Sequence, residues 1–276
     1  MDFMFHRIYR GPLKAAIFDW AGTTVDFGCM APASVFVELF EKHGVQVTVE
    51  QARQPMGMHK KDHLRVMLSM PSIASQWQKE KGHTPGHADV DMLFTEFVPM
   101  QVACIGKHTD LVPGVLEVIS ELRRRGLRIG STTGYNDVMM SVLTPEAAKA
   151  GYEPDSMVCV NEVPEGRPSP WMALECAKRL GVYPMESIVK VGDTPVDIGE
   201  GLNAGMWTVG VIEHGNEVGL SEVDLHALPD EVRKSRFEYA RQRLAGAGAH
   251  FLIQSIRELP VIIDSINTRL ARGERP

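Results

Sequence analysis

Acidic side chains follow two of the short apolar runs in this sequence. Asp19 comes directly after Ala15–Phe18, and Asp193 comes shortly after Ile188–Val191, with Asp197 four residues further on. Carboxylate oxygens are the hard ligands that Mg²⁺ prefers, and an ionised carboxylate is a nucleophile that needs no base. Each acid alone has a simpler explanation, because Asp is common in turns and at helix N-termini.

A hydroxyl-rich segment and a cation stand at two further element ends. Thr133 and Gly134 end the run that begins at Ile129, and Arg167 precedes Pro168 where a helix is expected to begin. Hydroxyls, backbone N–H groups and a guanidinium are suited to holding phosphate oxygens. Turns and caps alone do not explain such groups at four separate element ends, so the sequence predicts a site for phosphoryl chemistry.

The segments that must position these residues alternate between strands and helices. Apolar runs rich in Ile, Val and Gly predict strands at Ala15–Phe18, Leu127–Ser131, Met157–Val160, Ile188–Val191 and Thr208–Val211. Helical patterns at Pro113–Arg125 and Pro170–Leu180 each stop at a glycine. This alternation predicts an α/β fold with a doubly wound, Rossmann-like parallel sheet, in which ligands bind beyond the carboxyl ends of the strands.

One interval interrupts this alternation. Between Asp19 and Pro113 the pattern predicts helices at Pro32–His43, Thr48–Arg53, Lys60–Leu68, Pro71–Lys79 and Val90–Ala103. Thr48 and Gln51 have the spacing of a capping box. We therefore expect an inserted all-helical cap at residues 29–106, with the sheet domain assembled from residues 1–28 and 107–276.

The four motifs occur in the order and at the strand ends typical of the haloacid dehalogenase superfamily, which the sequence resembles over its whole sheet domain. The resemblance implies that Asp19 is a nucleophile that forms an aspartyl-phosphate. It also implies that Thr133 and Gly134 bind the phosphoryl oxygens and that Arg167 is the cation of the third motif. A Mg²⁺ cofactor, held by Asp19 and Asp193, is implied as well.

Two positions depart from the common superfamily pattern. Ala21 stands where most superfamily phosphatases carry an aspartate that protonates the leaving alcohol. The resemblance implies that Ala21 still offers its backbone carbonyl to the metal ion. The third-motif cation, Arg167, is usually a lysine. The last acid, Asp197, supports the metal site, and the sequence leaves open whether it does so directly or through water.

A segment of the expected cap narrows the resemblance to the phosphonoacetaldehyde hydrolase family. Pro55-Met56-Gly57 is followed by Lys60 and by Asp62-His63, beside the sheet-domain signatures Phe18–Asp26, Gly130–Tyr135, Gly166–Pro168 and Ala204–Val211. In that family the lysine that matches Lys60 forms a Schiff base with the substrate aldehyde. The resemblance implies hydrolysis of phosphonoacetaldehyde to acetaldehyde and phosphate, with substrate-binding or supporting places for Met56, Gly57, His63, Cys29 and Tyr135.

The chemistry of that reaction gives a reason for the lysine. Cleavage of a carbon–phosphorus bond expels a carbanion, which is a far poorer leaving group than an alkoxide. A protonated imine accepts the electron pair, so that the carbon leaves as a neutral enamine. Lys60 must then be partly neutral, and burial or nearby positive charge must lower its pKa. Most pairs such as Lys60-Lys61 are solvated helix surface, and the resemblance reverses that expectation for Lys60 only.

Composition limits the other classes of function. The 276 residues carry a formal net charge of −6, which gives no sequence-wide basis for binding nucleic acid or an anionic membrane. The longest apolar stretches are far shorter than a membrane helix needs. Widely spaced cysteines and the lack of a secretory signal pattern favour a cytoplasmic location. We expect a small phosphonate as the partner, and the resemblance implies a homodimer.

Two other functions stay open from the sequence. A superfamily phosphatase or phosphomutase that acts on a small phosphate monoester would not depend on Lys60, although Ala21 argues against it. A non-catalytic binding protein would keep the fold without the chemistry, although the intact Asp19, Thr133, Arg167 and Asp193 argue against that.

Overall fold

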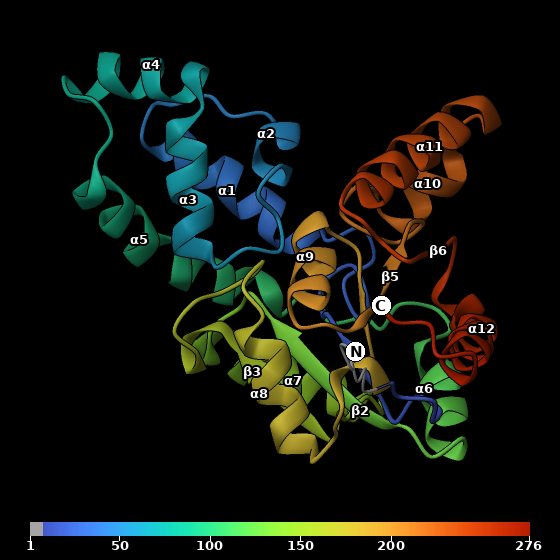
Figure 1. The fold of residues 1–276 in the computed structure, drawn as a ribbon. Coiled ribbons are helices and arrows are strands. Elements are labelled where there is room, and N and C mark those ends of the chain that lie inside the picture. Colours follow the sequence, from blue (N-terminus) through green and yellow to red (C-terminus); the bar gives the residue numbers. More distant parts are fainter. Residues whose placement is uncertain (1–7) are drawn as a thin grey trace, which may run out of the picture.

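The computed structural model describes residues 8–276, so residues 1–7 of the expected sheet domain lie outside the described part. A parallel sheet of six strands forms the centre, and a group of helices stands beyond one end of it (Figure 1). The strand order is β3-β2-β1-β4-β5-β6, which is the doubly wound Rossmann order. The strands are β1 (Ala15–Phe18), β2 (Arg128–Thr133), β3 (Ser156–Cys159), β4 (Ile188–Gly192), β5 (Trp207–Val211) and β6 (Phe251–Ile253). The predicted α/β class is confirmed.

The central strand β1 is buried on both faces. Ala15 and Ile17 belong to a cluster with residues of α8, and Ala16 and Phe18 belong to the larger cluster on the opposite face. Successive side chains of a strand point to opposite faces, so a strand between two helical layers must be apolar at every position. This is why the run before Asp19 shows no polar alternation.

Helices of the sheet domain cover both faces of the sheet. They are α6 (Val115–Arg124), α7 (Asp137–Lys149), α8 (Trp171–Leu180), α9 (Pro195–Asn203), α10 (Glu222–Ala227), α11 (Asp230–Gly246) and α12 (Leu259–Ala271). Short 3₁₀ turns lie at Val160–Glu162, Met185–Ser187 and Ile256–Glu258. α8 packs on β2 and β3, and α9 packs on β4 and β5. From residue 8 onward, no helix combines the length and the apolar character that a bilayer crossing requires.

Five helices between β1 and α6 form a separate group, which we call the cap (Figure 1). They are α1 (Met30–Lys42), α2 (Val49–Arg53), α3 (Lys60–Ser69), α4 (Pro71–Lys81) and α5 (His87–Ile105). α1 and α3 both pack against α5. The expected helices agree with these to within a few residues, and the Thr48/Gln51 capping box is present. α5 begins earlier than expected, because Asp89 caps the N–H of Gly86.

Aromatic side chains fill the interior of the cap. Phe36 of α1 stacks on Phe97 of α5 with ring centroids 4.4 Å apart, and Phe40 meets Trp77 of α4 edge to face at 6.4 Å. All four rings are fully buried. The cap therefore has a hydrophobic core built from its own helices.

Two neighbouring chain crossings join the cap to the sheet domain. Val25 and Leu111 pair in an isolated antiparallel bridge. The carboxylate of Asp26 accepts bonds from the N–H groups of Met30 and Ala31, each at 3.0 Å, at the start of α1. Because the crossings pair with each other, they fix the point from which the cap extends. The domain boundaries at residues 28/29 and 106/107 stay a prediction from the sequence.

Replacing Trp77 with alanine is expected to destabilise the cap by about 3–5 kcal/mol, because a large buried ring and its contact with Phe40 are lost. Urea unfolding, with hydrogen exchange in α1–α5 as a local probe, measures the effect. Val49→Ala is the matched control, since Val49 is an exposed residue of the same cap. Equal losses in the two variants would contradict this assignment of the cap core.

Candidate active site

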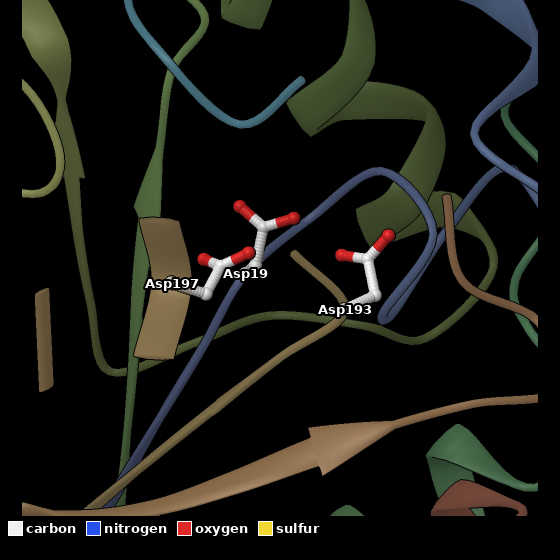
Figure 2. A group of neighbouring side chains, drawn as sticks. All are labelled: Asp19, Asp193 and Asp197. Carbon is white, nitrogen blue, oxygen red and sulfur yellow. The ribbon is translucent and has the colours of Figure 1, made fainter. Parts of the chain in front are cut away.

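Three carboxylates meet at the carboxyl ends of β1 and β4. Asp19 follows β1, Asp193 follows β4, and Asp197 lies in the first turn of α9 (Figure 2). All three are buried, and one oxygen from each lies within 4.8 Å of the others. Parallel strands bring their carboxyl ends to one edge of the sheet, which is how residues far apart in the chain come together.

Asp193 is held in place by hydrogen bonds but forms no ion pair with a cation among the described residues. Its Oδ1 accepts a bond from the Thr23 hydroxyl at 2.9 Å, and its Oδ2 accepts one from the N–H of Asn216 at 2.7 Å. Burial, followed by repulsion from Asp19 and Asp197, raises the pKa of Asp193 well above its usual value. A site that disfavours an ionised carboxylate in this way is suited to a bound cation.

Asp197 faces cations instead. Its Oδ1 lies 2.9 Å from Arg167 and 3.0 Å from Lys190, and its Oδ2 accepts a bond from the Thr194 hydroxyl at 2.5 Å. Burial alone would raise the pKa of Asp197, but Arg167 and Lys190 outweigh burial and lower it. Both oxygens of Asp197 therefore already have partners within the protein.

The donor set fits a hard divalent cation such as Mg²⁺. Burial raises the pKa of Asp19 although Arg167 opposes the rise. Asp19 and Asp193, with the backbone carbonyl of Ala21, are the groups that would hold the ion. The bonds of Asp197 to protein cations give it a supporting place, and we expect any contact of Asp197 with the ion to pass through water.

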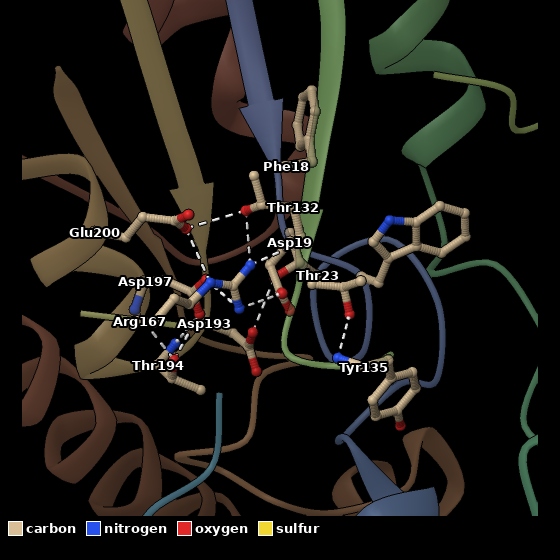
Figure 3. Close-up of polar contacts among 12 residues, drawn as sticks. Phe18, Asp19, Thr23, Thr132, Tyr135, Arg167, Asp193, Thr194, Asp197 and Glu200 are labelled. Carbon is tan, nitrogen blue, oxygen red and sulfur yellow. Dashed lines mark hydrogen bonds and ion pairs between the residues drawn. The ribbon is translucent and has the colours of Figure 1, made fainter. Parts of the chain in front are cut away.

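Arg167 uses its planar fork to join three parts of the sheet end (Figure 3). Its Nη1 donates to Asp19 Oδ1 at 2.6 Å, its Nη2 donates to the carbonyl and hydroxyl of Thr132 at 2.7 and 2.8 Å, and its Nε donates to Glu200 at 2.9 Å. A guanidinium makes such multiple bonds in a fixed plane, whereas a lysine ammonium is a point charge. This pattern accounts for an arginine at a position where the superfamily usually carries lysine.

Two members of this network were missed by the sequence reasoning. Lys190 lies in the middle of β4 and is fully buried, and its Nζ contacts Thr132, Asp197 and Glu200 at 3.0–3.2 Å. Glu200 lies on α9, one turn beyond Asp197. A lysine inside an apolar strand, followed by a glutamate near the end of the fourth motif, is the signal that could have identified the pair.

A cavity of about 20 Å³ lies between the cap and the sheet domain, room for about one water. Most of the residues singled out from the sequence line it, namely Asp19, Ala21, Cys29, Met56, Gly57, Lys60, Thr133, Gly134, Tyr135 and Arg167. Pro32 and Thr194 also line it and were not predicted. Asp193, Asp197 and His63 are buried and do not line the cavity themselves.

Lys60 is buried where α3 begins. Its Nζ lies 3.7 Å from Met56 Sδ and above the rings of Tyr135 and Phe36, at 5.2 and 5.8 Å from their centroids. Burial lowers the pKa of Lys60 to about 8, although Cys29 and Asp19 act in the opposite direction. A measurable fraction of Lys60 is therefore neutral near pH 7, as an imine-forming lysine requires.

Three titratable side chains near Lys60, those of His63, Cys29 and Tyr135, favour their neutral forms. His63 stacks on Phe36 at 3.8 Å, and its Nε2 lies 2.8 Å from the carbonyl of Ala52. Burial, followed by Lys60, lowers the pKa of His63 well below its usual value. Burial also raises the pKa of Cys29 and of Tyr135 well above their usual values. On the cap side, the amine therefore lies among neutral groups, and the ion pair of Asp19 and Arg167 lies across the cavity.

The loop at residues 55–57, which we call the cap loop, lies so close to the sheet domain that glycine is required on both sides. Gly57 has φ +87°, and a Cβ there would lie 2.5 Å from Thr194 Oγ1. A Cβ on Gly134 would lie 2.7 Å from the carbonyl oxygen of Met58. Any side chain at either position would push the two surfaces apart. The pair therefore allows the close fit that leaves so small a cavity.

Comparison with known proteins shows the family to which the chain belongs. The haloacid dehalogenase-like hydrolase family matches residues 13–205. A protein from Nitratidesulfovibrio vulgaris named phosphonoacetaldehyde hydrolase is 50% identical over 274 residues, which cover 99% of this chain and 98% of that one. The chain belongs to the phosphonoacetaldehyde hydrolase family.

Further relatives agree with that family. A protein of the same name from Paraburkholderia phytofirmans is 45% identical over 96% of this chain and 99% of its own. The crystal structure of a phosphonoacetaldehyde hydrolase-like protein from Oleispira antarctica is 43% identical, with a TM-score of 0.97 and full coverage of both chains. The architecture of sheet and cap is thus shared with a solved relative over its whole length.

Replacing Arg167 with lysine is expected to lower the free energy of unfolding by about 2–3 kcal/mol, because one ammonium cannot reach Asp19, Thr132 and Glu200 together. Denaturant unfolding measures this. Arg125→Lys is the control: Arg125 also bonds to two acids, Glu121 and Asp264, but on the surface, and the change there should stay within about 0.5 kcal/mol. An equal loss in both variants would show that the buried fork is not what Arg167 contributes.

Proposed function

We propose that this protein is a Mg²⁺-dependent hydrolase that converts phosphonoacetaldehyde and water to acetaldehyde and phosphate. The observation that carries the proposal is a buried lysine with a pKa of about 8, Lys60, lining the same small cavity as Asp19. Ala21, in the place of the usual general acid, adds support. The names of the relatives described above point to the same substrate.

The first step is at the cap. The neutral amine of Lys60 attacks the aldehyde carbon, and loss of one water gives an imine that carries the proton. The buried surroundings favour this step because they disfavour the free ammonium. Met56, Cys29 and Tyr135 line the space around the lysine and exclude solvent. His63, with Nδ1 buried and without a partner among the described residues, is suited to orienting a proton near Lys60.

The second step is at the sheet end. Asp19 attacks phosphorus, the bond between phosphorus and carbon breaks, and its electron pair moves into the protonated imine to give a neutral enamine. Thr133 and the N–H of Gly134 hold the phosphoryl oxygens, and the positive charge of Arg167, beside Asp19, stabilises their negative charge. When bound at Asp19 and Asp193, Mg²⁺ supplies positive charge that offsets the repulsion between two anions.

Water completes the reaction. Protonation of the enamine carbon and hydrolysis of the resulting imine release acetaldehyde and restore Lys60. Hydrolysis of the aspartyl-phosphate releases phosphate and restores Asp19. One water leaves when the imine forms and two are consumed afterwards, so the net reaction uses one. Because the cavity has room for about one water, the cap must move away from the sheet domain to admit substrate.

A phosphate monoester remains the alternative substrate class. It would be cleaved by the same Asp19 without any part for Lys60, but its alkoxide would need a proton donor that Ala21 does not provide. Activity on a sugar phosphate that survives Lys60→Arg would favour this alternative. A homodimer and a cytoplasmic location stay predictions from the sequence and its resemblance.

Borohydride reduction in the presence of phosphonoacetaldehyde is expected to attach the substrate carbon covalently to Lys60, located by peptide mass mapping. Lys60→Arg should abolish both the adduct and turnover, because a guanidinium does not form the imine. Lys61→Arg is the matched control, since Lys61 pairs with Asp91 on the cap surface. An adduct elsewhere, or normal turnover in Lys60→Arg, would refute the imine mechanism.

The rate of imine trapping is expected to rise with pH and to level off above a midpoint near 8, because only the neutral amine reacts. Between pH 7 and pH 9 the neutral fraction of such a group grows about tenfold, whereas an ordinary lysine would gain about a hundredfold without levelling off. Stopped reactions with borohydride at fixed aldehyde concentration measure the profile. A rate still climbing steeply at pH 10 would contradict the shifted pKa.

A further inference from the structure

Arg53, the last residue of α2, lies across the junction between the cap and the sheet domain. Its Nη1 donates to the carbonyl oxygens of Gly28 at 2.8 Å and Cys29 at 3.2 Å, and to Oδ1 of Asn216 at 3.0 Å. Asn216 returns a bond from its Nδ2 to the backbone oxygen of Arg53 at 3.3 Å. The two residues therefore hold each other across the junction.

Asn216 also contacts one of the proposed metal ligands. Its backbone N–H donates to Asp193 Oδ2 at 2.7 Å. The preceding Gly215 packs so closely that a Cβ would lie 2.7 Å from the Cβ of Asp193. In the same segment, Nδ1 of His214 lies 2.7 Å from the carbonyl of Gly22. The segment 214–216 thus fixes one side of the Asp193 carboxylate.

On the cap side of the contact, Arg53 lies two residues before the cap loop. In that loop, residues 55–57, Met56 and Gly57 line the active-site cavity, and the chain then continues to α3 and Lys60. Beside the Arg53–Asn216 contact, α2 and α11 are separated by a cleft of about 1010 Å³. The contact is therefore a local bridge beside an open space, and it links Asp193 by hydrogen bonds to Arg53, from which the backbone leads into the cap loop.

We propose that Arg53 and Asn216 are positioning residues that couple closure of the cap to the geometry of Asp193. Docking of Arg53 fixes Asn216, whose N–H then orients Asp193. Coupling of this kind is reciprocal, so a cation that orders Asp193 favours the closed cap, and closure strengthens cation binding. The inference rests on the proposed function for the identity of the cation, Mg²⁺, but not on the imine chemistry.

The bonds allow the coupling to be removed without removing the ligand. Asn216→Ala deletes both side-chain bonds to Arg53 and keeps the backbone N–H that reaches Asp193. Arg53→Met keeps much of the volume of the side chain but loses its donors to Asn216 and to the two carbonyls. Neither Arg53 nor Asn216 is itself proposed to bind substrate through its side chain or to hold the metal ion.

Calorimetric titration of the metal-free protein with Mg²⁺ tests the proposal directly. Arg53→Met and Asn216→Ala are each expected to weaken Mg²⁺ binding by about fivefold or more. The double variant should bind no more weakly than the single ones, because both changes break one link. Arg65→Met is the matched control, since Arg65 is a cap arginine that pairs with Asp62 of its own helix, and it should bind Mg²⁺ as the unchanged protein does.

Hydrogen exchange supplies the second measurement. Mg²⁺ is expected to slow exchange in residues 54–60 of the unchanged protein, and to have no such effect in Asn216→Ala. Losses of Mg²⁺ affinity that multiply in the double variant, or protection that persists in Asn216→Ala, would overturn the coupling. If Arg53→Met does not fold, Arg53→Lys replaces it, with an expected affinity between those of the unchanged protein and Asn216→Ala.

The outcomes separate this inference from the proposed function. If a Lys60 adduct forms while all variants bind Mg²⁺ equally, the coupling is wrong and the reaction stands. If Mg²⁺ affinity falls as expected while no adduct forms, the reaction is wrong and the coupling stands.

Discussion

The balance of buried charge at the carboxyl ends of β1 and β4 is the constraint on which the rest of the structure depends. When ionised, four carboxylates face two cations there: Asp19, Asp193, Asp197 and Glu200 against Arg167 and Lys190. Buried ions are costly unless they are paired, by several kcal/mol each. The deficit of positive charge is concentrated at Asp193, whose pKa is raised in consequence. A divalent cation would restore the balance at the place where the proposed chemistry needs it.

This distribution of charge also determines what the cap must contribute. The two fixed cations are held by Asp197 and Glu200, and Asp19 is bonded to Arg167 through Oδ1. In the proposed reaction the carboxylate of Asp19 is the nucleophile. In the proposed reaction the carbon leaving group needs an acceptor for its electron pair. A neutral amine can provide that acceptor by forming an imine, whereas a third fixed cation could not. Lys60 satisfies this requirement because burial against Met56, Phe36 and Tyr135 keeps it easily deprotonated. Met56 and Phe36 belong to the cap and Tyr135 to the sheet domain, so both parts bury Lys60 where Gly57 and Gly134 allow their close approach.

The sequence predicted features that depend on local pattern and on position in the chain. Strands were recognisable because both faces are covered, and Asp19 and Asp193 were recognisable because they end such strands. α7 was missed because Pro145 lies inside it. Lys190 and Glu200 were missed for a different reason: a charge inside an apolar strand has meaning only when its partners on another element are known. Arg53 and Asn216 are likewise far apart in the chain, and nothing in their local sequence indicates that they meet.

Ala21 ties these observations to the choice of leaving group. An aspartate at residue 21 would add a further carboxylate to a site already short of positive charge, and it would not provide the electron sink that a departing carbon needs. In the proposed reaction the electron sink for that carbon comes from the cap, where Lys60 is the one buried amine among the described residues that line the cavity. The absence of an acid at residue 21 and the presence of Lys60 on the cap are thus both consistent with a carbon leaving group, as the proposed function requires. The same sheet end, with an acid at residue 21 and no lysine above it, would suit an oxygen leaving group instead.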